Sequence, residues 1–110
     1  MKILESSAGL NERQTFQITK GDSLGRLRDN VGRRFDIMEY VLYEDTNRDG
    51  VDQTLLAVVT SDGDIIATNS ATAIRMFLDM KESFALPITD VEVTSGTTKA
   101  GRMYCNFRLV

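Results

Sequence analysis

Clusters of Asn, Asp, Ser and Gly cut the chain after residue 33 into short apolar segments, and this spacing constrains its fold more than any other feature. Two clusters lie at 45–50 and 61–64, and their residues tolerate the left-handed backbone of a tight reversal. The segments 33–44, 51–60 and 65–68 are rich in residues that suit a pleated sheet, so they predict three consecutive antiparallel strands. Neither face of the first strand is purely polar, so we expect it to be covered on both sides or to bend.

A single helix is predicted after these strands, over residues 71–84. Its apolar residues recur at helical spacing along one stripe, made of Ile74, Phe77, Leu78 and Phe84. Asn69 or Ser70 supplies the N-cap, because either side chain can accept from an unpaired N–H of the first turn. Pro87 prevents the helix from continuing.

Two further strands are predicted at 88–94 and 102–110, with a loop bounded by glycines at 95–101. Three strands, a helix and a hairpin form the element order of the OB-fold, a five-stranded Greek-key barrel. We therefore expect a mainly β fold, a five-stranded OB-fold-like barrel with one helix between strands 3 and 4.

The N-terminal 30 residues are predicted to lie outside the five-stranded barrel. Residues 1–12 predict a polar extension, and 14–19 predict a short extra strand because Phe16 and Ile18 alternate with polar residues. Residues 20–30 predict a loop with one helical turn. A length of 110 residues fits one domain, 1–110.

Composition argues against an enzyme. The chain has no histidine, so it lacks the commonest general base and the usual nucleophile pairs. Its one cysteine, Cys105, excludes an intramolecular disulfide. We expect no cofactor and no catalytic residue. No apolar run reaches the ~7–15 residues of a signal peptide, so the expected location is the cytoplasm.

A calcium loop is the alternative to a simple turn at 45–52. Asp45, Asn47, Asp49 and Gly50 match the first half of an EF-hand loop. The position of the bidentate glutamate is Leu56, and the flanks predict strands instead of helices. A hairpin turn explains the same residues, so no metal site is predicted.

The last predicted strand has two different faces. Its odd positions are apolar and predict a core face, made of Met103, Cys105, Phe107 and Leu109. Its even positions place Arg102, Tyr104 and Arg108 on the other face, with Lys99 just before them. Cations for phosphates and aromatic rings for bases are what single-strand binding requires.

Charge is unevenly distributed along the chain. Residues 11–34 and 95–110 each have a balance of +3, whereas 35–94 have −9, and the whole chain is −3. In an OB barrel the first and last strands can be neighbours, which would bring Arg33 and Arg34 close to the basic last strand. A local basic stripe can bind phosphates on an acidic protein, because salt screens charges more than ~8–10 Å apart.

Three short segments carry a resemblance to a known family: 43–47 (YEDTN), 67–70 (ATNS) and 96–104 (GTTKAGRMY). From about residue 14 to residue 110, the chain resembles the small single-stranded-DNA-binding proteins of bacteriophages, which act in the cytoplasm of the host, and of related mobile elements of Gram-positive bacteria. This resemblance implies an OB-like fold, no catalysis, and a role in coating single-stranded DNA during replication or recombination. Many such proteins end in an acidic tail that recruits partners, whereas 106–110 (NFRLV) has a strand pattern.

The sequence thus predicts a non-catalytic protein that binds single-stranded DNA with little dependence on base sequence. Phosphates are expected on Arg33, Arg34, Lys99, Arg102 and Arg108. Bases are expected on Tyr104, Tyr40 or Phe35. Other replication proteins and a second copy are partners left open. The alternative is a protein–protein adaptor or structural phage protein that uses the acidic middle region.

Overall fold

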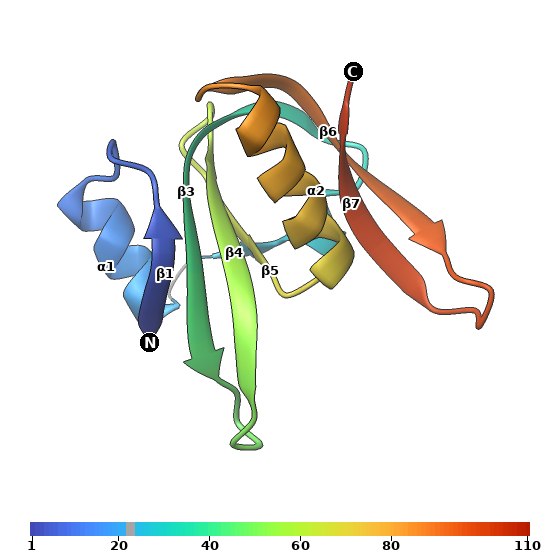
Figure 1. Ribbon diagram of the computed structural model, residues 1–110, viewed down its shortest axis with the longest axis horizontal. Coiled ribbons are helices and arrows are strands. Elements are labelled where there is room, and N and C mark those ends of the chain that lie inside the picture. Colours follow the sequence, from blue (N-terminus) through green and yellow to red (C-terminus); the bar gives the residue numbers. More distant parts are fainter. Residues whose placement is uncertain (22–23) are drawn as a thin grey trace.

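The structure is a computed structural model that describes residues 1–21 and 24–110 (Figure 1). Its elements are β1 (Lys2–Ser6), α1 (Glu12–Lys20), β2 (Gly25–Arg26), the 3-10 turn η1 (Leu27–Asn30), β3 (Arg34–Thr46), β4 (Asp52–Thr60), β5 (Ile65–Thr68), α2 (Ala71–Ser83), β6 (Ile88–Thr97) and β7 (Met103–Leu109). The prediction of a mainly β fold is confirmed. The described chain has seven strands, one more than predicted. The predicted helical turn is η1, while positions 22 and 23 of that loop lie outside the described residues.

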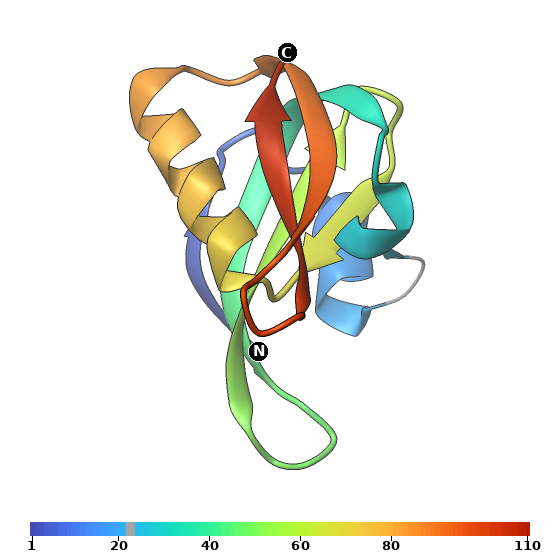
Figure 2. The ribbon, with the colours of Figure 1, turned by 90° about the vertical axis from the view of Figure 1, so that its right-hand side faces the viewer.

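The sheet curls into a half-barrel with the strand order β2-β5-β4-β3-β6-β7. Strands β2 and β5 run parallel over two residues, and the other neighbours in this order are antiparallel. In the described part, β2 and β7 are the two ends of the order and do not pair with each other. A seam therefore stays open between them, where a closed five-stranded barrel is predicted. Figure 2 shows the β6–β7 hairpin in front, with α2 on one side and η1 on the other.

Strand β3 contributes to two cores because both of its faces are covered, and a bulge at Met38 shifts its alternation by one residue. Phe35, before the bulge, and Tyr40, after it, both belong to the core inside the half-barrel. Val41 belongs to a second core on the outer surface of the sheet. The expectation that this strand is covered on both sides or bends is confirmed, and both descriptions apply.

Helix α2 packs its apolar stripe into the half-barrel. Phe77 is fully buried, and its ring centroid lies 5.0 Å from that of Tyr40 and 6.4 Å from that of Phe107. The aromatic contacts join the helix to β3 and β7. Phe84, predicted on the same stripe, is 47% exposed because the helix ends at Ser83.

The segment 14–19, predicted as a strand, lies within helix α1, so that prediction is wrong. Asn11 and Gln14 form a capping box in which each side chain accepts from the other residue's N–H, at 2.8 and 3.1 Å. Ile18 is buried in the outer core, whereas Phe16 is 60% exposed. Two apolar residues two positions apart therefore do not establish a strand here.

Residues 1–12 are not a simple extension, because they contain β1 as well as the start of α1. Strand β1 pairs antiparallel with β3. The Glu5 carboxylate on β1 accepts hydrogen bonds from the Tyr40 hydroxyl, at 2.7 Å, and from the Lys81 ammonium of α2. These contacts connect the N-terminal strand to α2 across β3. Most side chains of β1 are exposed, so no face of the strand needs apolar residues. Its sequence therefore lacks the alternation that would predict a strand.

We expect Glu5 to make the stability of the fold depend on pH in acid. Hydrogen bonds from Lys81 and Tyr40 lower the pKa of Glu5 below 4.5. Its contribution is thus present above the unfolded pKa near 4.5 and is lost as pH falls through the lower folded pKa. Glu5→Gln should lower the melting temperature at neutral pH and flatten its fall in acid, measured by circular dichroism. Equal acid sensitivity of both proteins would contradict this.

Candidate nucleic-acid interface

Strand β7 presents two different faces, as its alternation predicts. Cys105 and Phe107 are buried in the inner core, which confirms that part of the prediction. Met103 and Leu109 are instead 65% and 43% exposed, because they stand at the two ends of a strand at the sheet edge. The opposite face, which we call the β7 face, has one residue before the strand and three within it: Arg102, Tyr104, Asn106 and Arg108.

Tyr104 is the exposed aromatic residue of the β7 face, with 38% of its surface accessible. It stands opposite Gly96 in the β6–β7 register. A Cβ atom on Gly96 would lie 2.5 Å from Cζ of the tyrosine ring, so the ring occupies the space above this glycine. Aromatic side chains that cover a glycine of the paired strand help to fix the strand register. The ring thus packs on Gly96 while part of it stays open to solvent.

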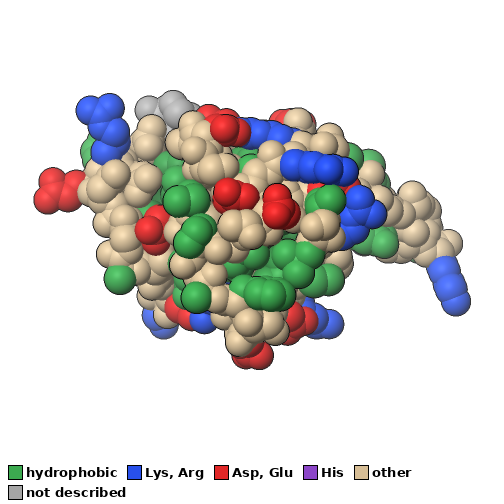
Figure 3. Space-filling view, turned by 90° about the horizontal axis from the view of Figure 1, so that it is seen from above, with side chains coloured by type: hydrophobic (Ala, Val, Ile, Leu, Met, Phe, Trp, Pro, Cys, Tyr) green, Lys and Arg blue, Asp and Glu red, His purple; other side chains and the backbone are tan. Residues whose placement is uncertain are grey.

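Arg34 and Arg108 meet on either side of one carboxylate. Strands β3, β6 and β7 place Arg34, Glu92 and Arg108 in one cross-strand row. Both guanidinium groups donate to Glu92, and these bonds, led by the one from Arg34, lower the pKa of the carboxyl. Arg34 lies close to the basic last strand, as expected, but the prediction that the first and last barrel strands are neighbours is wrong, because β6 stands between β3 and β7. Figure 3 shows several cationic side chains on the β6–β7 side of the end of the molecule that it views.

Arg33 is not available as a phosphate contact. Its guanidinium donates to Asp62 at 2.9 Å and to Asp64 at 2.7 Å, and both bonds raise its pKa. Its side chain is 28% exposed and lies over the Phe35 ring, 5.5 Å from the centroid. We therefore remove Arg33 from the candidate set and assign it to holding the start of β3 against the β4–β5 turn.

Phe35 and Tyr40 are wrong as sites for base stacking. Each ring is buried in the inner core, with 5% of the residue exposed. The Tyr40 hydroxyl is bonded to Glu5, and burial raises its pKa. Neither ring offers an open face to a base, so Tyr104 is the one sequence-predicted stacking residue that the structure leaves accessible.

A cleft of about 720 Å³ lies along the open seam of the sheet. Met103, Tyr104 and Cys105 of β7 line one bank, and 25–28 of β2 and η1 line the other. Its floor comes from β4, β5 and the segment that leads into α2, with Gln53, Leu55, Ala67, Thr68, Asn69 and Ser70. Arg26 and Arg28 are exposed at this cleft, and sequence reasoning missed them as site residues. The signal that they offered was two positive charges two positions apart in a segment predicted as a loop with one helical turn.

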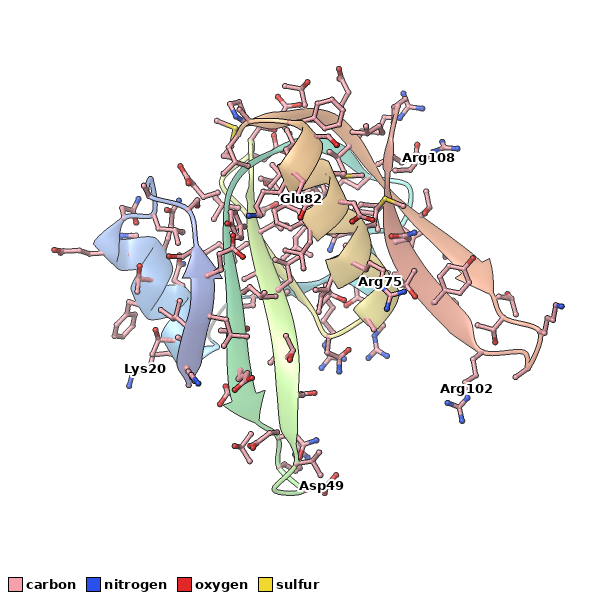
Figure 4. The ribbon with its side chains drawn as sticks, in the orientation of Figure 1. Lys20, Asp49, Arg75, Glu82, Arg102 and Arg108 are labelled. Atoms are coloured by element: carbon pink, nitrogen blue, oxygen red, sulfur yellow. The ribbon has the colours of Figure 1, made fainter. Side chains whose placement is uncertain are left out.

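Lys99 and Arg102 lie in the turn that joins β6 to β7, and both are exposed. Figure 4 shows Arg102 near the tip of the β6–β7 hairpin and Arg108 toward its other end. The same view shows Asp49 at the tip of the β3–β4 hairpin, which projects in a different direction. The two hairpins thus separate the basic end of the chain from part of the acidic middle.

The β3–β4 turn is closed by its own oxygen atoms, and the prediction of a hairpin turn is confirmed. Asn47 Oδ1 accepts from the N–H groups of Asp49 and Val51, at 2.9 and 3.0 Å. Asp52 Oδ1 accepts from the Thr46 hydroxyl at 2.7 Å. Over residues 1–21 and 24–110, no three His, Cys, Asp or Glu side chains are grouped so that they could hold a metal ion.

The two α-helices of the described chain are too short or too polar to span a membrane.

The residues that the structure brings together are the β7 face, the Arg34–Glu92–Arg108 row and the two arginines across the seam cleft. Comparison with protein-family models, with curated proteins and with solved structures gives no match for this chain.

Proposed function

We propose that this chain binds single-stranded DNA, with little dependence on base sequence and without catalysing a reaction. The observation that carries the proposal is the accessible Tyr104 ring, which is seated on Gly96 of β6 while residue 104 itself borders the seam cleft. An aromatic ring stacks on any base, so this contact does not select a sequence. Arginines before and after Tyr104 on the same face supply donors for the adjoining phosphates.

The order of the elements supports an OB-like interpretation of the half-barrel. Strands β3, β4 and β5, helix α2, and strands β6 and β7 follow the element order of that fold. OB-folds bind oligonucleotides on their second and third strands and the adjoining loops. The corresponding strands here are β4 and β5, and both line the seam cleft. We therefore propose that the DNA strand crosses this cleft, in the replication or recombination of a phage or mobile element.

The proposed surface is locally basic although the chain is acidic. It collects six cations from three separate parts of the sequence: Arg26, Arg28, Arg34, Lys99, Arg102 and Arg108. Exposed acids on the β3–β4 hairpin contribute little at this surface if they lie beyond a Debye length of ~8–10 Å. The net charge of −3 is therefore compatible with binding to phosphates.

Binding should prefer a single strand and weaken steeply with salt. We expect a labelled oligo-dT to bind more tightly than a duplex of equal length, because a duplex keeps its bases away from Tyr104. Each contacted phosphate of a single strand contributes about −0.7 to the slope of log K against log salt, so about five contacts give a slope of about −3.5. Fluorescence anisotropy at several salt concentrations measures both quantities.

Absence of oligo-dT binding at about 100 µM protein, the weak end of non-specific affinity, would refute the proposal. Equal affinity for single strand and duplex would refute its stacking part, and a flat salt dependence its electrostatic part. Failure on all counts would favour the adaptor alternative, with the acidic middle region as the contact surface.

A further inference from the structure

Three charged side chains form a line across the outer surface of three adjacent strands. The register places Arg34 of β3 opposite Glu92 of β6, and Glu92 opposite Arg108 of β7. Glu92 Oε2 accepts from Arg34 Nε at 3.0 Å, and Oε1 accepts from an Nη of Arg108. A guanidinium has five N–H donors, and the bonds to Glu92 use one donor on each arginine.

The three side chains differ in their exposure. The Glu92 side chain is 15% exposed, whereas those of Arg34 and Arg108 are 62% and 61% exposed. The carboxylate thus lies low between two guanidinium groups that reach into solvent. Each guanidinium keeps four N–H donors that are not bonded to Glu92, and the row has a net charge of +1.

The row also lies on the surface proposed to hold DNA. Arg108 and Tyr104 share the β7 face and stand four residues apart. At ~3.4 Å per residue, this separation is about 14 Å along the strand. A strand of DNA with one base on Tyr104 that continued along β7 would therefore bring a phosphate a few nucleotides further along to this row.

We propose that the Arg34–Glu92–Arg108 row is a phosphodiester subsite in which Glu92 competes with the incoming phosphate for the two arginines. This inference rests on the proposed single-strand binding. Carboxylate and phosphate oxygens accept from the same guanidinium donors, so one can replace the other. Glu92 keeps the two guanidinium groups side by side in the unbound protein, at the cost of weaker attraction for phosphate. The contact lets the protein release DNA more readily than two unpaired arginines would.

Glu92→Gln tests the competition directly. The amide keeps the shape of the side chain and removes its charge, so we expect oligo-dT to bind about two- to fivefold more tightly at low salt, the range typical of an exposed ion pair. The salt slope should become more negative by about 0.7, as expected for one more neutralised phosphate. Asp49→Asn is the matched control, because it changes the net charge equally at the tip of the other hairpin.

Two further measurements isolate the subsite. In an Arg34→Gln/Arg108→Gln background, Glu92→Gln should tighten binding less than it does with both arginines present, because only the direct repulsion between the carboxylate and the phosphate is left to remove. In the wild-type protein, the nitrogen NMR signal of Arg34 Nε–H should shift on addition of oligo-dT, a readout that needs no substitution.

Several outcomes would overturn the subsite while leaving the proposed function intact. One is a wild-type protein that binds oligo-dT while Glu92→Gln binds no more tightly than Asp49→Asn. Others are a gain in the double-arginine background that is as large as the gain with both arginines present, and an Arg34 signal that DNA leaves unchanged. A wild-type protein that binds no single strand would instead refute the proposed function itself.

Discussion

Tyr104→Ala should weaken binding of oligo-dT by roughly tenfold or more, because a base stacked on an aromatic ring contributes ~1–3 kcal/mol. The ring is accessible on one side and rests on Gly96 on the other, so its removal takes away the stacking surface without opening the core. Tyr104→Phe should retain most of the affinity, because the ring and not the hydroxyl stacks. Fluorescence titration at low salt measures both variants.

A matched control and a second variant sharpen this prediction. Phe16→Ala removes an exposed aromatic residue from α1 and should leave the affinity unchanged. Gly96→Ala places a methyl group where the Tyr104 ring lies, so it should displace the ring and weaken binding. If Tyr104→Ala binds as tightly as Phe16→Ala, Tyr104 does not stack on DNA.

Phe77→Ala should cause the largest loss of stability of any single truncation considered for this chain, about 3–5 kcal/mol. Phe77 is fully buried and contacts Tyr40 of β3 and Phe107 of β7, so its removal leaves a cavity where α2 meets the half-barrel. For a domain of about 100 residues, this loss should lower the melting temperature by at least about 12 °C. Urea unfolding followed by circular dichroism measures the free energy of unfolding.

Met76→Ala provides the comparison on the same helix, because Met76 is 36% exposed and its truncation should cost much less. Phe77→Leu should fall between the two, since it keeps part of the buried volume. Similar losses for Met76→Ala and Phe77→Ala would show that α2 does not pack into the half-barrel through Phe77.

The second half of the fold was predictable because its signals are local. Turn residues mark the ends of β3, β4 and β5, and the alternation of β7 identifies its two faces. The N-terminal part was not predictable in the same way. Strand β1 exists through its pairing with β3, and its exposed side chains show no pattern. Helix α1 has only nine residues, too few for a helical period to outweigh two alternating apolar positions.

The candidate site was predictable only where its residues are grouped by a local sequence pattern. Arg102, Tyr104 and Arg108 share a face in any strand with this alternation, so the sequence was enough to group them. The pairing of Arg33 with Asp62 and Asp64 joins residues about thirty positions apart, which no local pattern reveals.

The buried position of Tyr40 could not be predicted from the sequence, because the bulge at Met38 decides which face of β3 its ring occupies. Arg26 and Arg28 become site residues only through the seam, which is a property of the whole sheet.

The open seam gives the half-barrel a mechanical compliance that a closed barrel lacks. Within the described residues no strand ladder joins β7 to β2, and the Ser70 hydroxyl donates to the Cys105 carbonyl at 3.3 Å. To widen, a closed barrel must break ladder hydrogen bonds, each with a net value of about 1 kcal/mol. Ser70 belongs to the floor of the cleft, so its bond to Cys105 does not join the two banks. What holds the banks together is the packing of Leu27 and Phe107 in the inner core and the backbone bonds of Gly32 and Arg33 to Val93. In the proposed complex, this compliance would let the β7 edge adjust to purines and pyrimidines, which differ in size.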